Sequence, residues 1–223
     1  MPRQSKRKFK QEKRYIVVFC EGESEQAYTD FLKKEFKDVV SIKRPSSPSS
    51  TGLFEEADSK FKKDKLYRDY AEVTDEIWFF FDVETKDKEK WDSRLKIIKR
   101  LRSLRKKSGI KVRLLMTTGC IEYWFMLHYK MFTPSIQTVA EKERIIAELI
   151  EKVPDYQKGD FNSTFKIAQN YPEAVKNAKK ILSNLIRDGL PGLEDTDERN
   201  WWLCKNCMTF SNVYEAIDYL TSL

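Results

Sequence analysis

Two stretches of the chain are apolar at nearly every position instead of at every second one. "YIVVFC" spans residues 15–20 and "IWFFF" spans residues 77–81. Antiparallel strands commonly face water on one side and alternate, whereas parallel strands are covered by helices on both faces and are continuously apolar. These two runs therefore predict parallel strands that are buried on both faces.

Strand and helix patterns alternate four times between residues 15 and 119. The expected strands are 15–20, 38–43, 76–82 and 111–119, and the expected helices between them are 24–37, 53–71 and 86–107. Ser24 is the expected N-cap of the first helix, and "RPSSPSSTG" at 44–52 is a loop. This alternation predicts an α/β fold, a four-stranded parallel sheet with right-handed crossovers and helices on both faces.

The second half of the chain has a helical pattern. A mostly buried helix is expected at 120–131, and further helices are expected at 138–153, 164–187 and 211–222, with the loop "DGLPGLEDTDERN" before the last one. We therefore divide the chain into a basic arm (1–14), an α/β domain (15–131) and a mainly helical C-terminal extension (132–223).

The expected compartment is the cytoplasm. No apolar run approaches the ~20 residues of a membrane span, and the apolar run at 15–20 is too short for the core of a signal peptide. Four cysteines without an export signal are expected to be reduced thiols.

The positive charge is concentrated near the N-terminus. The chain has a net charge of +7, and residues 1–14 carry seven Lys or Arg against one Glu, so the arm accounts for six of these seven charges. Such an arm either anchors nucleic acid, with Lys6, Arg7 and Lys8 as candidate contacts, or is a solvated tail.

A second basic stretch, "KIIKRLRSLRKK", lies in the expected helix 86–107. It allows two interpretations. Either it is the polar face of a helix that covers the sheet, or it contacts phosphates. The candidate phosphate contacts are Arg100, Arg105, Lys106 and Lys107.

Acidic residues follow three of the expected strands. Glu21, Asp82 and Glu122 lie at or just after the ends of strands one, three and four, and the carboxyl ends of parallel strands meet in one crevice. Glu84 lies two residues after Asp82, so in an extended segment both point to the same side. Clustered carboxylates suit Mg²⁺ or Mn²⁺, and Gly22 would allow a sharp turn beside the ion. We expect a metal site here.

Other chemical signals are weak. His128 is the only histidine and lies on an apolar stripe, so we expect a hydrogen-bonded core residue. Cys204 and Cys207 form a single pair, whereas zinc needs four ligands, so both are expected to be structural thiols. The sequence contains no GxxxxGK[ST] loop, which argues against an ATPase activity of the chain itself.

Several motifs resemble a known family. "CEG" at 20–22 and the acidic pair with one spacer resemble the TOPRIM metal-binding fold, although Asp-Val-Glu stands where that fold usually has Asp-x-Asp. In order along the chain, "CEGESEQAYTDFL", "CIEYWFMLHYK", "YQKGDF" and "NCMTFSNVYEAIDYL" are similar to motifs of the RloB-like family, with Ile121 in place of Phe and Cys207 in place of Pro. The resemblance covers most of residues 15–223.

This resemblance implies a Mg²⁺- or Mn²⁺-dependent TOPRIM-type nuclease of antiphage defence that works beside a partner ATPase. Glu21, Asp82 and Glu84 would be catalytic metal ligands and Glu122 a fourth ligand. Lys158 would lie near the scissile phosphate, or else is a surface lysine in a turn. The alternative is a non-catalytic nucleic-acid-binding or partner-sensing subunit. DNA or RNA as substrate, tRNA included, and the oligomeric state, a homo-oligomer included, stay open.

Overall fold

A computed structural model describes residues 12–49, 52–105 and 108–223. Its centre is a four-stranded sheet in the order β2-β1-β3-β4, in which all neighbouring strands are parallel. The strands are β1 (Arg14–Cys20), β2 (Val40–Lys43), β3 (Glu76–Val83) and β4 (Lys111–Thr118). The predicted four-stranded parallel sheet is confirmed.

The helices follow the strands in the expected alternation and then dominate the C-terminal region, as predicted. They are α1 (Glu23–Glu35), α2 (Leu53–Lys63), α3 (Lys65–Ala71), α4 (Trp91–Arg102), α5 (Ile121–Leu127), α6 (Val139–Lys152), α7 (Phe161–Ala168), α8 (Tyr171–Asn184), α9 (Asp197–Asn206) and α10 (Tyr214–Thr221). Two short 3-10 helices, η1 (Thr85–Lys90) and η2 (Leu185–Asp188), complete the set.

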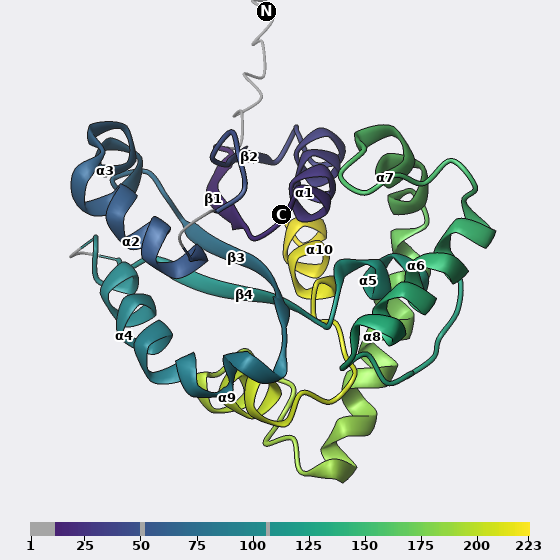
Figure 1. Cartoon of the computed structure of the whole chain (residues 1–223). Helices are drawn as coiled ribbons and strands as arrows, with labels where there is room; N and C mark the ends of the chain where they lie inside the picture. The colour runs from purple at the N-terminus through teal and green to yellow at the C-terminus, as the bar shows by residue number, and fades with distance from the viewer. Residues whose placement is uncertain (1–11, 50–51, 106–107) are drawn as a thin grey trace, which may run out of the picture.

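The two continuous apolar strands bury side chains on both faces of the sheet. On one face, Phe79 stacks on Phe54 of α2 with ring centroids 4.2 Å apart. On the other face, Phe80 meets Tyr28 of α1 edge-to-face, and Tyr28 in turn contacts Trp124 of α5. Figure 1 shows α2, α3 and α4 on one side of the sheet and α1, α5 and α10 on the other. Cover on both faces is the reason that these strands do not alternate.

Three predicted helices differ from the observed ones in the first half of the chain. The helix expected at 53–71 is two helices, because Asp64 ends α2 and its side chain accepts a hydrogen bond from the Leu66 amide at the start of α3. The helix expected at 86–107 begins as η1, and its α-helical part is α4 alone. Ser24 is not an N-cap, since Gly22 holds that position and Ser24 lies inside α1.

The C-terminal helices also differ from prediction. The helix expected at 164–187 is split into α7 and α8, because Pro172 at the start of α8 has no amide hydrogen and favours a first turn. Helix α9 occupies part of the predicted loop and the residues after it, and Thr196 caps it by accepting from the Arg199 amide. The Thr-Asp-Glu sequence at 196–198 was a usable N-terminal signal for that helix.

The C-terminal region adds to the edge of the sheet. The Asn212 side chain accepts from the Met116 amide at 2.6 Å and donates to the Leu114 carbonyl at 2.8 Å, and Ser211 forms a bridge with Thr117 of β4. These contacts cover part of the outer edge of β4. The division between residues 131 and 132 stays a prediction.

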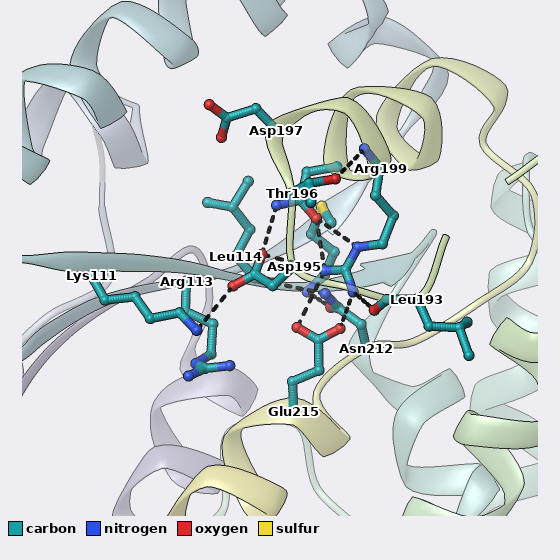
Figure 2. A network of polar contacts seen from close by, with 12 residues as sticks. Lys111, Arg113, Leu114, Leu193, Asp195, Thr196, Asp197, Arg199, Asn212 and Glu215 are labelled. Carbon is teal, nitrogen blue, oxygen red and sulfur yellow. Dashed lines mark hydrogen bonds and ion pairs between the residues drawn. The ribbon is translucent and has the colours of Figure 1, made fainter. Parts of the chain in front are cut away.

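A polar network lies between α9, α10 and the amino half of β4 (Figure 2). Arg199, whose exposed fraction is 0%, is at its centre. Its guanidinium donates to Glu215 at 2.6 Å, to the Leu193 carbonyl at 2.7 Å and to Asn200 at 2.9 Å. Every part of this buried cation therefore has an acceptor within the protein.

The residues discounted as chemical signals are buried. The His128 ring lies beside the Trp124 carbonyl at 3.0 Å and the Tyr28 hydroxyl at 3.4 Å, and burial lowers its pKa to about 4. It is a hydrogen-bonded core residue, as predicted. All four cysteines are buried thiols. In the described part of the chain, no helix is long and apolar enough to cross a membrane.

Candidate functional site

The carboxyl ends of the two central strands bring two predicted site residues together. Glu21 follows β1 directly, and its amide donates to the Phe80 carbonyl of β3 at 3.0 Å. The Glu21 carboxylate then accepts from the Asp82 amide at 3.2 Å. The parallel register of β1 and β3 thus places these two carboxyl groups side by side.

A third carboxylate, which sequence reasoning missed, comes from the first turn of α1. Glu25 is only 4% exposed. Gly22 makes room for it, because a Cβ at Gly22 would lie 2.6 Å from the Glu25 Oε2 atom. The chain bends at Gly22, as expected, but its φ of −129° is extended backbone that any residue adopts, so glycine is needed here for space and not for its backbone angle. The usable signal was a glutamate three positions after an N-cap glycine, where the side chain folds back on the helix start.

Glu122 supplies a fourth carboxylate from the first turn of α5. It is completely buried. Its Oε1 atom accepts from the Tyr156 hydroxyl at 2.9 Å and lies 3.9 Å from the Lys158 ammonium. Its Oε2 atom has no hydrogen-bond partner, and neither has the buried Oδ1 atom of Asp82. Buried polar atoms without partners are rare in proteins and point to a missing ligand or proton.

The loop that carries Tyr156 and Lys158 is held against α1. Gly159 has a φ of +77°, and its amide donates to the Ser24 hydroxyl at 3.0 Å. A Cβ at Gly159 would lie 2.8 Å from the Glu23 Cβ atom, so glycine fits both the backbone angle and the space. Ser24, expected as a helix cap, therefore anchors the loop that covers the acidic residues.

The acidic residues perturb one another. Burial raises the pKa of Asp82 well above its ordinary value, and the charges of Glu25, Glu21 and Glu122 raise it further, while Lys142 lowers it. Burial also raises the pKa of Glu25 to about 7, with Glu122 and Glu21 adding to the effect. We call Glu21, Glu25, Asp82 and Glu122 the carboxylate cluster.

Glu84 lies at the border of this cluster, where it forms an ion pair with Lys142 of α6. Lys142 is the second residue that sequence reasoning missed. It lies 58 positions from Glu84 in the chain, and no local pattern indicates such a contact.

The predicted basic contacts are placed elsewhere or lie outside the described residues. Arg100 pairs with Asp58 of α2, and Arg105 donates to the carbonyl groups of Gly109 and Glu72 at 3.3 and 3.4 Å. These contacts favour the interpretation of that helix as a packed polar face. The other candidates lie outside the described residues; they are Lys6, Arg7, Lys8, Lys106 and Lys107.

The donor types of the cluster fit a hard divalent cation. Carboxylate oxygens are the ligands that Mg²⁺ and Mn²⁺ prefer, and two of these oxygens are buried without a partner. In the described ranges, however, no three His, Cys, Asp or Glu side chains form a ready metal site. Binding would therefore require rotation of side chains in the cluster.

Comparison with known proteins gives the family. No curated protein and no solved structure is significantly similar to the chain. The family model described as "RloB-like protein" matches residues 16–220, which include every described member of the carboxylate cluster together with Glu84, Lys142 and Lys158. The chain therefore belongs to the RloB-like protein family.

Proposed function

We propose that the protein is a divalent-metal-dependent nuclease that hydrolyses phosphodiester bonds of DNA or RNA. The observation that carries this proposal is the carboxylate cluster. Four acids from three separate segments converge beyond the carboxyl ends of a parallel sheet, where α/β proteins bind their ligands. Buried oxygen atoms of Asp82 and Glu122 have no partner.

Such a cluster is costly unless a cation joins it. Carboxylates that share a buried site raise one another's pKa, because each charge opposes the next. Clusters of perturbed acids mark functional sites more often than structural ones. A module that only binds nucleic acid would have no reason to place four acids where phosphates must approach.

The chain's own residues would divide the work as follows. Glu21, Glu25, Asp82 and Glu122 would hold the cation, and Glu84 would join them, as the family motif implies. A bound Mg²⁺ or Mn²⁺ supplies an activated water and neutralises the charge that develops on the phosphate. The Tyr156 hydroxyl fixes one oxygen of Glu122 and leaves the other available.

The biological setting that we propose follows the family. The protein would act as the nuclease effector of an antiphage defence system, with tRNA among its candidate substrates and an ATPase as its partner. The absence of a GxxxxGK[ST] loop from the sequence supports a division of labour in which another protein hydrolyses the nucleotide.

One observation favours the second candidate, a non-catalytic subunit that binds nucleic acid or senses a partner. As described, the acids do not form a ready metal site. A family member that had lost catalysis would keep the fold and the cluster in this form.

Cleavage assays separate the two candidates. Wild type, Asp82→Asn and Glu122→Gln are incubated with duplex DNA, single-stranded DNA, structured RNA and tRNA, each with Mg²⁺, Mn²⁺ or EDTA, alone and after co-expression with a candidate partner ATPase. A nuclease cleaves at least one substrate with metal and loses this activity in both variants. Glu173→Gln, which removes a partly exposed acid of α8 outside the cluster, is the matched control and should cleave like wild type. Binding without cleavage under every condition would identify the non-catalytic subunit.

A further inference from the structure

Lys142 is a cation held at the border of the carboxylate cluster. Its ammonium forms an ion pair with Glu84, the residue that follows β3. The side chain is 24% exposed and that of Glu84 is 26% exposed, so both are largely shielded from water. Lys142 belongs to the C-terminal helical region, yet its charge lies at the carboxyl end of β3.

The helix that carries Lys142 is fixed at its start. Thr138 and Glu141 form a reciprocal capping box at the N-terminus of α6. The Gln137 side chain accepts from the Thr85 hydroxyl at 3.0 Å and donates to the Cys207 carbonyl at 2.8 Å. Thr85 is the neighbour of Glu84, so this bond ties the start of α6 to the segment that Lys142 contacts. The start of α6 therefore fixes the position of the Lys142 backbone.

The ion pair borders a hollow that is open to solvent. A cavity of about 220 Å³ is lined by Glu84, Thr85, Ile136, Gln137, Val139 and Lys142. Val139 at its rim is 72% exposed, so the hollow can be reached from outside. The space admits a phosphate group next to the ammonium without rearrangement of the core.

Lys158, the lysine that the sequence suggested, is less firmly held than Lys142. It is 68% exposed and lies 3.9 Å from Glu122, a longer contact than an ordinary ion pair. An exposed lysine with a loose contact contributes little fixed geometry, because its long side chain must be ordered by the ligand itself. Of the two lysines at the cluster, Lys142 is the preorganised one.

We propose that Lys142 is the phosphate-binding lysine of this site. Its ion pair with Glu84 keeps the Lys142 ammonium from binding phosphate until a divalent cation binds the Glu84 carboxylate. This assignment rests on the proposed function and adds a second ligand, the phosphodiester backbone of the substrate. Lysine binds phosphate as a compact point charge. When Glu84 turns to the cation, the ammonium becomes available to a phosphate in the adjoining hollow.

The exchange makes cation binding and phosphate binding cooperative. Glu84 and a phosphate compete for the same ammonium, so anything that removes Glu84 from Lys142 increases affinity for the phosphate. By thermodynamic reciprocity, a bound phosphate also releases Glu84 and increases affinity for the cation. The pair therefore couples loading of the metal to loading of the substrate.

Binding in EDTA tests this coupling without turnover. The anisotropy of a labelled duplex DNA and a labelled RNA hairpin is measured against salt with wild type, Glu84→Gln, Lys142→Gln and the double variant. Glu84→Gln frees Lys142, so we expect about fivefold tighter binding and, on duplex DNA, a salt slope steeper by about 0.9, the value for one added phosphate contact. The steeper slope should be absent from the double variant. Glu148→Gln, which removes an equal charge from the exposed pair with Lys130, should leave the slope unchanged.

The outcomes distinguish this inference from the nuclease proposal. An unchanged salt slope in Glu84→Gln, or a steeper one that persists in the double variant, would overturn the role of Lys142 even in a protein that cleaves. A Lys142-dependent increase in a protein that never cleaves would support the role of Lys142 and refute the nuclease. Lys158→Gln combined with Glu84→Gln should keep the gain, and its loss there would transfer the phosphate contact to Lys158. Failure of every variant to bind either nucleic acid would overturn both proposals.

Discussion

The two ends of the sheet differ in whether their buried acids have cationic partners. At the amino end, acids have cations as direct partners: Glu76 pairs with Arg113 through two hydrogen bonds of 3.0 Å, and Glu215 pairs with Arg199 (Figure 2). At the carboxyl end, Glu25, Asp82 and Glu122 lie close to one another, and the lysine nearest to Glu122 is 3.9 Å away.

This difference separates charge that serves the fold from charge that serves a ligand. A buried ion pair with complete hydrogen bonding is self-sufficient, and loss of either partner leaves an uncompensated charge. The carboxylate cluster is incomplete in the same sense before any mutation, because Asp82 and Glu122 each keep an oxygen without a partner. Removing one charge of an ion pair should therefore destabilise the protein at the amino end. Removing one carboxylate at the carboxyl end should instead reduce the repulsion within the cluster.

The largest expected effect is at the amino end. Arg199→Leu leaves Glu215 buried without its cation and should lower the free energy of unfolding by about 3–5 kcal/mol. Denaturant unfolding monitored by tryptophan fluorescence measures it. The double variant Arg199→Leu/Glu215→Leu should recover part of the loss, because it removes the orphaned charge. A loss below about 1 kcal/mol in the single variant, the range of an exposed pair, would remove the contrast between the two ends.

The second effect is a pH dependence at the carboxyl end. Burial raises the pKa of Glu25 from 4.5 to about 7, so between these pH values the folded protein binds a proton that the unfolded chain releases. The contribution of Glu25 to stability should therefore fall as pH rises from about 4.5 to about 7, by up to about 3 kcal/mol. Glu25→Gln has no proton to lose, so its stability should rise relative to that of wild type over this range.

The matched control is His128, whose pKa shift makes its contribution to stability change with pH in the opposite direction. Burial lowers the pKa of His128 from 6.5 to about 4, so its contribution to stability is lost as pH falls through that window, and His128→Gln should remove only that acid-side loss. Unfolding curves of the three proteins in EDTA from pH 4 to pH 8 test both signs. A difference in stability between Glu25→Gln and wild type that stays constant from pH 4.5 to pH 7 would show that Glu25 is not part of the cluster.

The third effect is on the response to metal. In EDTA, Asp82→Asn removes a like charge from the cluster and should be neutral or stabilising by about 1 kcal/mol. Wild type should gain thermal stability from millimolar Mg²⁺ or Mn²⁺, and the variant should lose most of this gain. Glu84→Gln should lose less of it, because the Glu84 carboxylate exchanges between Lys142 and the cation. A wild-type thermal unfolding midpoint that neither metal changes would refute the cation site.

The sequence predicts the parallel sheet and part of the cluster for one reason. Continuous apolar runs and the residues that end them are local features, so the positions of Glu21, Asp82 and Glu122 follow from strand ends alone. Glu25 is also local, but the interpretation of Ser24 as an N-cap concealed the real start of α1 at Glu23. With Ser24 as the N-cap, Glu25 would be the first helical residue, whereas the observed N-cap Gly22, two positions earlier, makes it the third, from where its side chain folds back on the helix start.

Other features depend on contacts that local patterns do not encode. The partner of Glu84 comes from α6, 58 positions later, and Glu215 meets Arg199 in a region expected to be a loop up to residue 200. The split at Asp64 is a competition between two caps and helix continuation, which a long polar pattern does not reveal. Sequence thus indicates three of the four acids of the cluster, whereas Lys142, the cation that pairs with Glu84, is found only after the chain has folded.

The smallest expected effect limits the contrast to buried charges. Lys179 pairs with Asp218 of α10 at 2.7 Å, but their side chains are 47% and 43% exposed. Water solvates both charges, so Lys179→Gln should change the free energy of unfolding by no more than about 0.5 kcal/mol, and salt should reduce even that. Denaturant unfolding at low and high salt measures it beside Arg199→Leu. A loss at Lys179 as large as that at Arg199 would mean that the whole amino-end surface stabilises the fold cooperatively, and burial would then no longer explain why its acids differ from those of the carboxylate cluster.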